Sequence, residues 1–213
     1  MPSRPAEGSA PLLTVEGLEC RRGERTLFSG LDFRLEPGAI VWLRGANGQG
    51  KTTLLRTVAG LSRPEAGRIL WSEPHPVRTL YLAHANALKE ELSALESLRF
   101  LRQLDGGTTD SVELAAALSR VGMASRRDAP VRTLSQGQRR RVALARLALP
   151  GTAPVWLLDE PFDALDAEGV EILNALLAEH AGRGGGTVLT SHLALTIATP
   201  RPETVSLDAL VPA

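Results

Sequence analysis

The amino-acid sequence predicts an α/β fold with a mostly parallel core sheet, and three observations support this. Short apolar runs at 39–43, 155–158 and 187–190 are typical of buried strands. Helical patterns separate these runs, and alternation of strands with helices favours parallel pairing. A mostly helical block at about 84–148 lies between the sheet-forming parts, so we expect an inserted helical subdomain there. The run at 187–190 is the last core strand that we expect.

Further strands are expected in the first part of the chain. Residues 12–18 and 27–35 alternate apolar and polar side chains, which predicts two strands. A Glu-Pro-Gly turn leads from the second of them into the first apolar run. Residues 67–71 and 79–82 are short apolar stretches that predict two more strands. Residues 1–11, rich in Pro, Ser, Ala and Gly, are expected to form a loose tail.

Helical patterns occur at four places. One, at 51–59, directly follows a glycine-rich loop, and a second, at 93–121, is broken at residues 105–107. Ser135 is a candidate N-cap for a third helix, because a serine oxygen can accept a backbone N–H at a helix start. Residues 167–180 form an amphipathic pattern and predict the fourth.

Composition agrees with a globular protein and narrows the classes of function. The chain has 213 residues, 43% hydrophobic and 23% charged, close to globular averages. Its formal net charge of zero disfavours general nucleic-acid binding, which usually needs a basic excess. The lone Cys20 allows no internal disulfide. There is no apolar run of about 18 residues and no apolar signal core near the N-terminus, so we expect a cytosolic location.

Residues 45–52 match the phosphate-loop pattern G-x-x-x-x-G-K-[ST], with an apolar strand before it and a helical pattern after it. Glycines let the backbone N–H groups wrap around a phosphate, and the following helix N-terminus favours negative charge. Lys51, one of only two lysines, can reach the β- and γ-phosphates, and the Thr52 hydroxyl can ligate Mg²⁺. The residues expected to bind the nucleotide here are Gly45, Ala46, Asn47, Gly48, Gln49, Gly50, Lys51, Thr52 and Thr53.

The apolar run at 155–158 ends in two acidic residues, Asp159 and Glu160. Burying charge is costly, so carboxylates directly after a buried strand need a reason to be there. Beside a phosphate loop, Asp159 would hold Mg²⁺ and Glu160 would activate the attacking water as general base. The two motifs together predict a nucleotide-hydrolysing site.

Residues 134–138, Leu-Ser-Gln-Gly-Gln, precede a helix that begins with three arginines. This segment resembles the L-S-G-G-Q signature of the nucleotide-binding subunits of ATP-binding cassette (ABC) transporters, with Gln136 in place of the first glycine. The resemblance implies a P-loop NTPase fold of the ABC cassette type over residues 12–207, with an antiparallel β subdomain beside the parallel sheet. For the arginines at 139–141 we expect a solvated helix face for at least two of the three.

The same resemblance implies partners and contacts across a dimer. ABC cassettes form head-to-tail dimers that sandwich two ATP molecules, so Ser135, Gly137 and Gln138 would contact the ATP held by a second copy of this chain. Asp166, in an Asp-Ala-Leu-Asp segment, is similar to the acid that communicates across that dimer. His192, after Thr-Ser, is similar to the family's switch histidine and would contact the γ-phosphate.

Two positions depart from the family pattern. His84 stands where the family usually has a glutamine that senses Mg²⁺ and the attacking water, and an imidazole can still order a water. Arg22 stands where an aromatic ring often stacks on adenine, and a guanidinium can stack on a flat ring. We keep both as candidate site residues, although an exposed loop position for Arg22 is an equally open alternative.

Linking segments at 60–67, 81–84 and 88–92, together with the short length, resemble one branch of the family. That branch is the ATP-binding subunit of the cytochrome c biogenesis haem exporter. It implies a peripheral ATPase on the cytoplasmic side of the inner membrane, with ATP and Mg²⁺ and separate integral-membrane subunits. Because Cys20 and the scattered histidines form no obvious ligand set, the complex rather than this chain would handle haem.

Three alternatives share many of these residues. The first is an ABC ATPase subunit that exports another substrate, which would have the same catalytic residues. The second is a non-transport cassette protein of DNA repair or translation, but those usually carry a long coiled-coil insertion or two cassettes in one chain. The third is a non-catalytic, ATP-gated assembly module, suggested by the histidine at position 84.

Overall fold

The computed structural model describes residues 10–72, 78–107 and 110–210, so residues 1–9 of the expected tail lie outside the described residues. The chain divides into two compact units. The first comprises the described residues up to Tyr81, the segment Ala153–Asp159 and the described residues from Ala178 onward. The second comprises Leu82–Thr152 and Glu160–Leu177. Each unit is described separately below.

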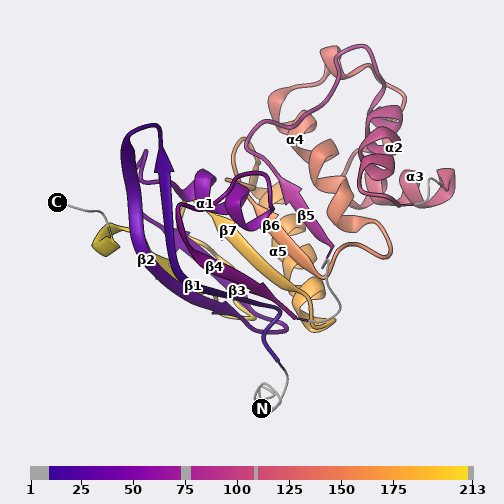
Figure 1. The fold of residues 1–213 in the computed structure, drawn as a ribbon. Helices are drawn as coiled ribbons and strands as arrows, with labels where there is room; N and C mark the ends of the chain where they lie inside the picture. Colours follow the sequence, from indigo (N-terminus) through magenta and orange to yellow (C-terminus); the bar gives the residue numbers. More distant parts are fainter. Residues whose placement is uncertain (1–9, 73–77, 108–109, 211–213) are drawn as a thin grey trace. The chain divides into compact units, whose positions relative to one another are not determined.

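The first unit contains an antiparallel sheet in the order β2-β1-β4, drawn in indigo and purple in Figure 1. The strands are β1 (Leu13–Arg22), β2 (Arg25–Leu35) and β4 (Ala66–Trp71). β1 is longer than its apolar–polar alternation suggests, because the register shifts between Val15 and Leu18. This bulge moves the buried positions by one residue and returns Cys20 to the core.

The second sheet of this unit has the order β5-β6-β7-β3-β8. β3 pairs in parallel with β7 and β8, and β6 pairs in parallel with β7. Every residue of β6 and β7 is buried, as expected for strands covered on both faces. The expected mostly parallel core sheet is therefore confirmed. Its strands are β3 (Ile40–Arg44), β5 (Thr79–Leu82), β6 (Val155–Leu158), β7 (Gly186–Thr190) and β8 (Glu203–Ser206).

The expectation that the run at 187–190 is the last core strand is wrong. β8 follows it and pairs along β3. Three of its four residues are exposed, and its sequence, Glu-Thr-Val-Ser, contains only one apolar residue. An edge strand of this kind has no apolar run, so hydrophobic patterning misses it.

The main core of the first unit lies between the antiparallel sheet, the parallel sheet and helix α1 (Lys51–Val58). Leu54, Leu55 and Val58 of α1 are buried in it, and burying such a side chain stabilises a fold by about 1.5–3 kcal/mol. Gly50, which caps α1, has φ 98°. A Cβ at this position would lie 3.0 Å from the Cβ of Leu27. Both the backbone angle and the close approach therefore require glycine here.

The second unit is helical, with α2 (Ala94–Leu104), α3 (Ser111–Arg120) and α4 (Gln136–Leu144). A 3₁₀ turn, Ala145–Ala148, continues α4. Each helix starts at a side-chain cap: Ser93 for α2, Asp110 for α3 and Ser135 for α4. The expected cap at Ser135 is confirmed.

Helix α5 (Ala167–Gly182) begins in the second segment of this unit, and its residues from Ala178 onward belong to the first unit. The described residues include further short 3₁₀ turns at Ala124–Arg126 and Val131–Thr133 in the second unit and at Asp208–Leu210 in the first. Among the described residues, no helix combines the length and the apolar character that a membrane-spanning helix needs.

The expectation of a solvated face for most of the arginines at 139–141 is wrong. Arg140 is 2% exposed and Arg141 8% exposed, whereas the Arg139 side chain is partly exposed. Both buried guanidinium groups find acceptors inside the second unit: backbone carbonyls for Arg140 and the carboxylates of Asp166 and Glu168 for Arg141. Burial of a charge is tolerated when such partners satisfy it.

Candidate functional site

The phosphate loop joins β3 to α1 in the first unit. The Lys51 ammonium donates to the carbonyls of Gly45 (2.7 Å) and Ala46 (3.2 Å) in the same loop. Gly45, Gly48 and Gly50 all have φ values in the positive range, which side chains with a Cβ rarely adopt. The loop therefore curls around its own lysine, with backbone angles that glycine supplies at low cost.

The C-terminal part of the chain supports this loop. The backbone N–H of Ala46 donates to Oδ1 of Asp208 (3.2 Å). The Gln49 side chain and the Ala46 N–H hold the pKa of Asp208 below its ordinary value. A Cβ at Gly45 would lie 2.4 Å from Oε1 of Gln49. A larger residue at the first position of the loop would therefore displace the Gln49 carboxamide from this place.

Asp159 is 2% exposed at the end of β6. Its Oδ2 accepts the Thr52 hydroxyl (2.8 Å) and its Oδ1 accepts the Thr190 hydroxyl from the end of β7 (2.9 Å). A carboxylate and a hydroxyl at this distance are the hard oxygen ligands that Mg²⁺ prefers, and Mg²⁺ commonly takes only one or two groups from the protein. The expected metal residues Thr52 and Asp159 therefore fit such an ion.

Sequence reasoning named Thr190 only as part of the segment before His192. Its position at the end of β7, beside β6, could have indicated its role, because the carboxyl ends of neighbouring parallel strands meet at one edge of a sheet. The described residues hold no cluster of three or more His, Cys, Asp or Glu that could bind a metal by itself. A divalent ion at Asp159 would thus complete its shell with water or phosphate oxygens.

Glu160 follows Asp159 in the chain and belongs to the second unit. It is buried, and its φ of 47° is a left-handed value that is rare for a residue with a side chain. Such conformations cost roughly 1–3 kcal/mol and persist only where the surroundings impose them. The Glu160 carbonyl accepts a 2.6 Å hydrogen bond from the Arg140 guanidinium, which is one group that holds the backbone there.

The remaining predicted catalytic residues, both histidines, are exposed. In the second unit the Nδ1 atom of His84 lies 3.5 Å from a carboxylate oxygen of Asp163. In the first unit His192 follows the end of β7. Its preceding residue, Ser191, accepts the backbone N–H of Leu193 (3.1 Å), so the turn that carries His192 is fixed locally. Exposure leaves both imidazoles accessible to a ligand.

In the second unit Ser135 and Gln138 form a reciprocal capping box. The Gln138 N–H donates to the Ser135 hydroxyl (3.2 Å), and the Ser135 N–H donates to the Gln138 side chain (3.0 Å). Gly137 lies so close to the Ala164 carbonyl that a Cβ would be 2.8 Å from its oxygen. The predicted signature residues are thus brought together with the 163–166 segment.

An open hollow of about 460 Å³ lies at this place in the second unit. Arg141 donates to both Asp166 and Glu168 at its edge. The guanidinium and the Gly169 N–H hold the pKa of Asp166 below its ordinary value, so this exposed acid is kept charged. The residues that line the hollow are Gly122, Met123, Ser135, Gly137, Gln138, Arg141, Ala164, Asp166 and Glu168.

The predicted adenine-stacking residue Arg22 is exposed at the end of β1, opposite Arg25 in the hairpin.

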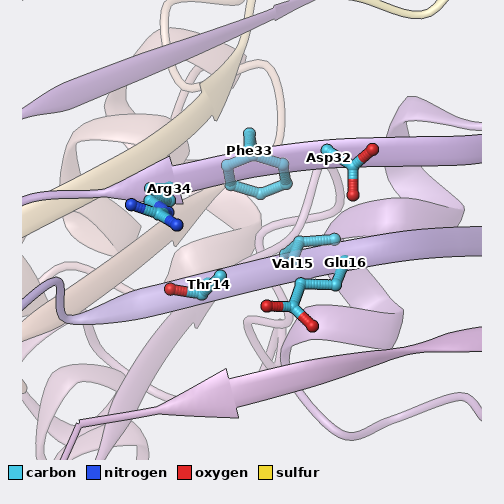
Figure 2. Close-up of a pocket in the computed structure, with 6 residues that line it drawn as sticks. All are labelled: Thr14, Val15, Glu16, Asp32, Phe33 and Arg34. Atoms are coloured by element: carbon cyan, nitrogen blue, oxygen red, sulfur yellow. The ribbon is translucent and has the colours of Figure 1, made fainter.

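A second hollow, of about 550 Å³, lies over β1 and β2 in the first unit, and Figure 2 shows its side chains on the two neighbouring strands. Its carboxylates are engaged within the sheet: Asp32 accepts the N–H of Gly17 (2.7 Å), and Glu16 accepts from Arg68 of β4.

The comparisons with known proteins agree with this geometry. The family model described as ABC transporter matches residues 28–163. The chain belongs to the ABC transporter family and is an ATPase subunit of that class. It is 47% identical to the protein of Escherichia coli O157:H7 named "Cytochrome c biogenesis ATP-binding export protein CcmA". This match extends over 204 residues, which are 92% of this chain and 96% of that protein.

Solved structures show the same fold. A putative ABC transporter ATP-binding protein from Pyrococcus furiosus superposes with a TM-score of 0.81 at 23% identity, over 94% of this chain and 99% of that one. A dimeric ATP-binding cassette in a post-hydrolysis state, bound to ADP and Pi, superposes with a TM-score of 0.75 at 21% identity, over 92% of this chain and 94% of that one. The predicted ABC cassette fold is therefore confirmed.

Proposed function

We propose that this chain is the ATP-hydrolysing subunit of an export complex for c-type cytochrome biogenesis, and that it powers haem export or release of a haem-loaded chaperone. The observation that carries the proposal is the 47% identity, over 92% of the chain, to a cytochrome c biogenesis ATP-binding export protein. The match extends over nearly the whole chain and is not confined to the nucleotide-binding motifs.

The first unit binds the phosphates of ATP in this proposal. The Lys51 ammonium, now on the Gly45 and Ala46 carbonyls, turns to the β- and γ-phosphate oxygens, whose negative charge attracts it more strongly. Backbone N–H groups of the loop and of the α1 N-terminus point toward the same phosphates. Thr52 and Asp159 hold Mg²⁺, which supplies neutralisation of the phosphate charge.

Hydrolysis uses Glu160 as the general base. The carboxylate accepts a proton from the attacking water, the water oxygen bonds to the γ-phosphorus, and the bond from the γ-phosphorus to the bridging oxygen breaks to leave ADP and phosphate. His192 donates a hydrogen bond to the γ-phosphate and stabilises its developing charge. His84 orders the water, and Arg22 stacks on the adenine.

A second copy of this chain completes the site. Ser135, Gly137 and Gln138 line an open hollow, and the helix N-terminus there favours negative charge. We propose that this surface covers the ATP bound by the other copy in a head-to-tail dimer, with Asp166 at the boundary. Integral-membrane subunits supply the membrane passage, and the ATPase dimer docks on them at the cytoplasmic side of the inner membrane. The net charge of zero supports the absence of nucleic acid among the partners.

The test of the biological role is to replace Lys51 with alanine in the source organism and to stain membrane proteins for covalently bound haem. Loss of all c-type haem staining, with this subunit and the cytochrome polypeptides at normal abundance, is the expected result. Unchanged staining would overturn the cytochrome role and would favour an ABC ATPase that exports another substrate.

A further inference from the structure

Arg140 makes a set of contacts that no predicted role explains. Its side chain is buried in the second unit, 2% exposed. Its Nη2 donates to the Glu160 carbonyl (2.6 Å) and its Nε donates to the Pro161 carbonyl (3.3 Å). One edge of the guanidinium therefore holds the backbone of the candidate general base and of the residue after it.

The other edge of the same guanidinium holds a second segment. Nη1 donates to the Ala83 carbonyl (3.0 Å), to the His84 carbonyl (3.4 Å) and to Oδ1 of Asn86 (2.9 Å). This segment follows β5 and carries His84, which stands at the position where the family resemblance places the group that senses the attacking water. Arg140 thus bridges two segments that are far apart in the sequence, 83–86 and 160–161, and each contains a predicted catalytic residue.

The chemistry of arginine makes this bridge rigid. A guanidinium is planar and presents five N–H donors in a fixed fork. Burying its charge is costly unless carbonyls or carboxylates accept those donors, so both segments must remain in place for the charge to be satisfied. Arg140 is itself held in place by its helix, because the apolar residues Val142, Ala143 and Leu144 of α4 are buried.

We propose that Arg140 is a positioning residue for ATP hydrolysis. It imposes the left-handed backbone at Glu160 (φ 47°) and links this backbone to the segment that carries His84. The segments that carry the Glu160 carboxylate and the water-ordering His84 are thereby held in a fixed position relative to each other. In this role Arg140 acts only through the two segments that it holds. This inference rests on the proposed role of Glu160 as general base.

The test is Arg140→Lys in the full chain, purified with the subunits that accompany it. Lysine keeps the charge but has its three donors on one nitrogen, so it can hold one segment and must release the other. We expect kcat for ATP hydrolysis to fall by about 10- to 100-fold, because a misplacement near 1 Å costs about that much, while KM stays within about twofold. A misaligned base affects the chemical step, whereas a general loss of fold would affect both parameters.

The matched control is Arg146→Lys. Arg146 is a partly buried arginine of the second unit, with 11% of its side chain exposed, and its guanidinium pairs with both carboxylate oxygens of Asp105 (2.7 and 3.1 Å). It lies outside the predicted site, so kcat should stay within about twofold of the parent value. If Arg140→Lys fails to fold, Asn86→Ala removes one of the bridging contacts alone, and a fall in kcat of several-fold at constant KM is expected.

Glu160→Gln is measured in parallel to separate the two proposals. If Glu160→Gln abolishes turnover and Arg140→Lys hydrolyses ATP like the parent, the inference about Arg140 is wrong and the proposed site stands. A large rise in KM for Arg140→Lys with kcat unchanged would also overturn the inference, because it would place Arg140 in binding. If Glu160→Gln turns over normally, the general-base assignment fails, and the role of Arg140 fails with it.

Discussion

At the scale of single residues, the carboxylate of Asp159, which we propose as a Mg²⁺ ligand, is held in one orientation. Two hydroxyls hold it, one from Thr52 of α1 and one from Thr190 of β7. When a buried carboxylate loses one of its hydrogen-bond donors, the free energy lost by removing it from water is no longer compensated. The pair of hydroxyls therefore both stabilises the fold and aims the carboxylate.

Replacing Thr190 with valine tests this arrangement. Valine fills nearly the same volume but removes the donor to Oδ1 of Asp159, so the free energy of unfolding should fall by about 1.5–3 kcal/mol. Urea denaturation measures it. The control is Thr187→Val, on the same strand and equally buried but paired with Trp156. An equal loss in both variants would show that the Asp159 contact contributes nothing of its own.

His180 provides a prediction about pH. Its ring stacks on Trp156 with centroids 3.7 Å apart, and Nε2 lies 3.3 Å from the Gly186 carbonyl. Burial lowers the pKa of His180 from 6.5 to about 4. Between pH 6.5 and about 4, His180 therefore binds a proton in the unfolded chain but not in the folded chain. The stabilising effect of the neutral ring is complete above pH 6.5 and is lost as the pH falls toward 4.

We expect the free energy of unfolding to drop by at most about 3 kcal/mol over that interval because of this one group, at 1.36 kcal/mol for each pH unit. The check is denaturation at a series of pH values, for the parent chain and for His180→Phe, which keeps an aromatic ring against Trp156. The variant should show a shallower decline between pH 6.5 and 4. Identical slopes would mean that His180 is not the group responsible.

At the scale of elements, local rules predicted most of the structure and failed where they ignore tertiary contacts. The strand and helix patterns and the cap at Ser135 are readable because apolar periodicity and capping chemistry are local. β8 was missed because an edge strand with one apolar residue carries no such pattern. A solvated face for at least two of the arginines at 139–141 is what charge alone predicts, but the acceptors of Arg140 lie at 83–86 and 160–161, far away in the sequence.

The phosphate loop and the acids after β6 were readable for a different reason, since phosphate and Mg²⁺ chemistry restricts the residue types at fixed spacing. The role of Thr190 in holding Asp159 needed the order of the strands, which spacing alone does not supply. The sequence thus indicates candidate ligand-binding groups, and the structure identifies neighbouring groups that hold them in place.

Two capping boxes in the second unit separate the structural role of Ser135 from its proposed role at ATP. Ser93 with Glu96 caps α2 in the same way that Ser135 with Gln138 caps α4. Replacing either serine with alanine should lower the free energy of unfolding by about 1 kcal/mol. Only Ser135→Ala should also weaken ATP-dependent dimerisation, measured by light scattering. If Ser93→Ala weakens it equally, the effect is one of stability.

At the scale of the whole molecule, the division of the chain passes between Asp159 and Glu160. The residues proposed to hold the phosphates and Mg²⁺ belong to the first unit, and those proposed to act as base and as signature belong to the second. Binding and hydrolysis are therefore separable by mutation, because a change at Glu160 leaves Lys51, Thr52 and Asp159 intact. A Glu160 variant should therefore accumulate in an ATP-bound state, because it binds ATP but does not hydrolyse it.

Glu160→Gln tests this separation in solution. The amide keeps the shape of the carboxylate but cannot take a proton from water, so ATP binds and stays bound. We expect size-exclusion chromatography with light scattering to show a dimer when ATP and Mg²⁺ are present and a monomer when they are absent. Adding Lys51→Ala to the same chain should restore the monomer, because phosphate binding is lost. A Glu160→Gln chain that stays monomeric with saturating ATP would contradict the sandwich dimer, whereas one that still hydrolyses ATP would contradict the general base.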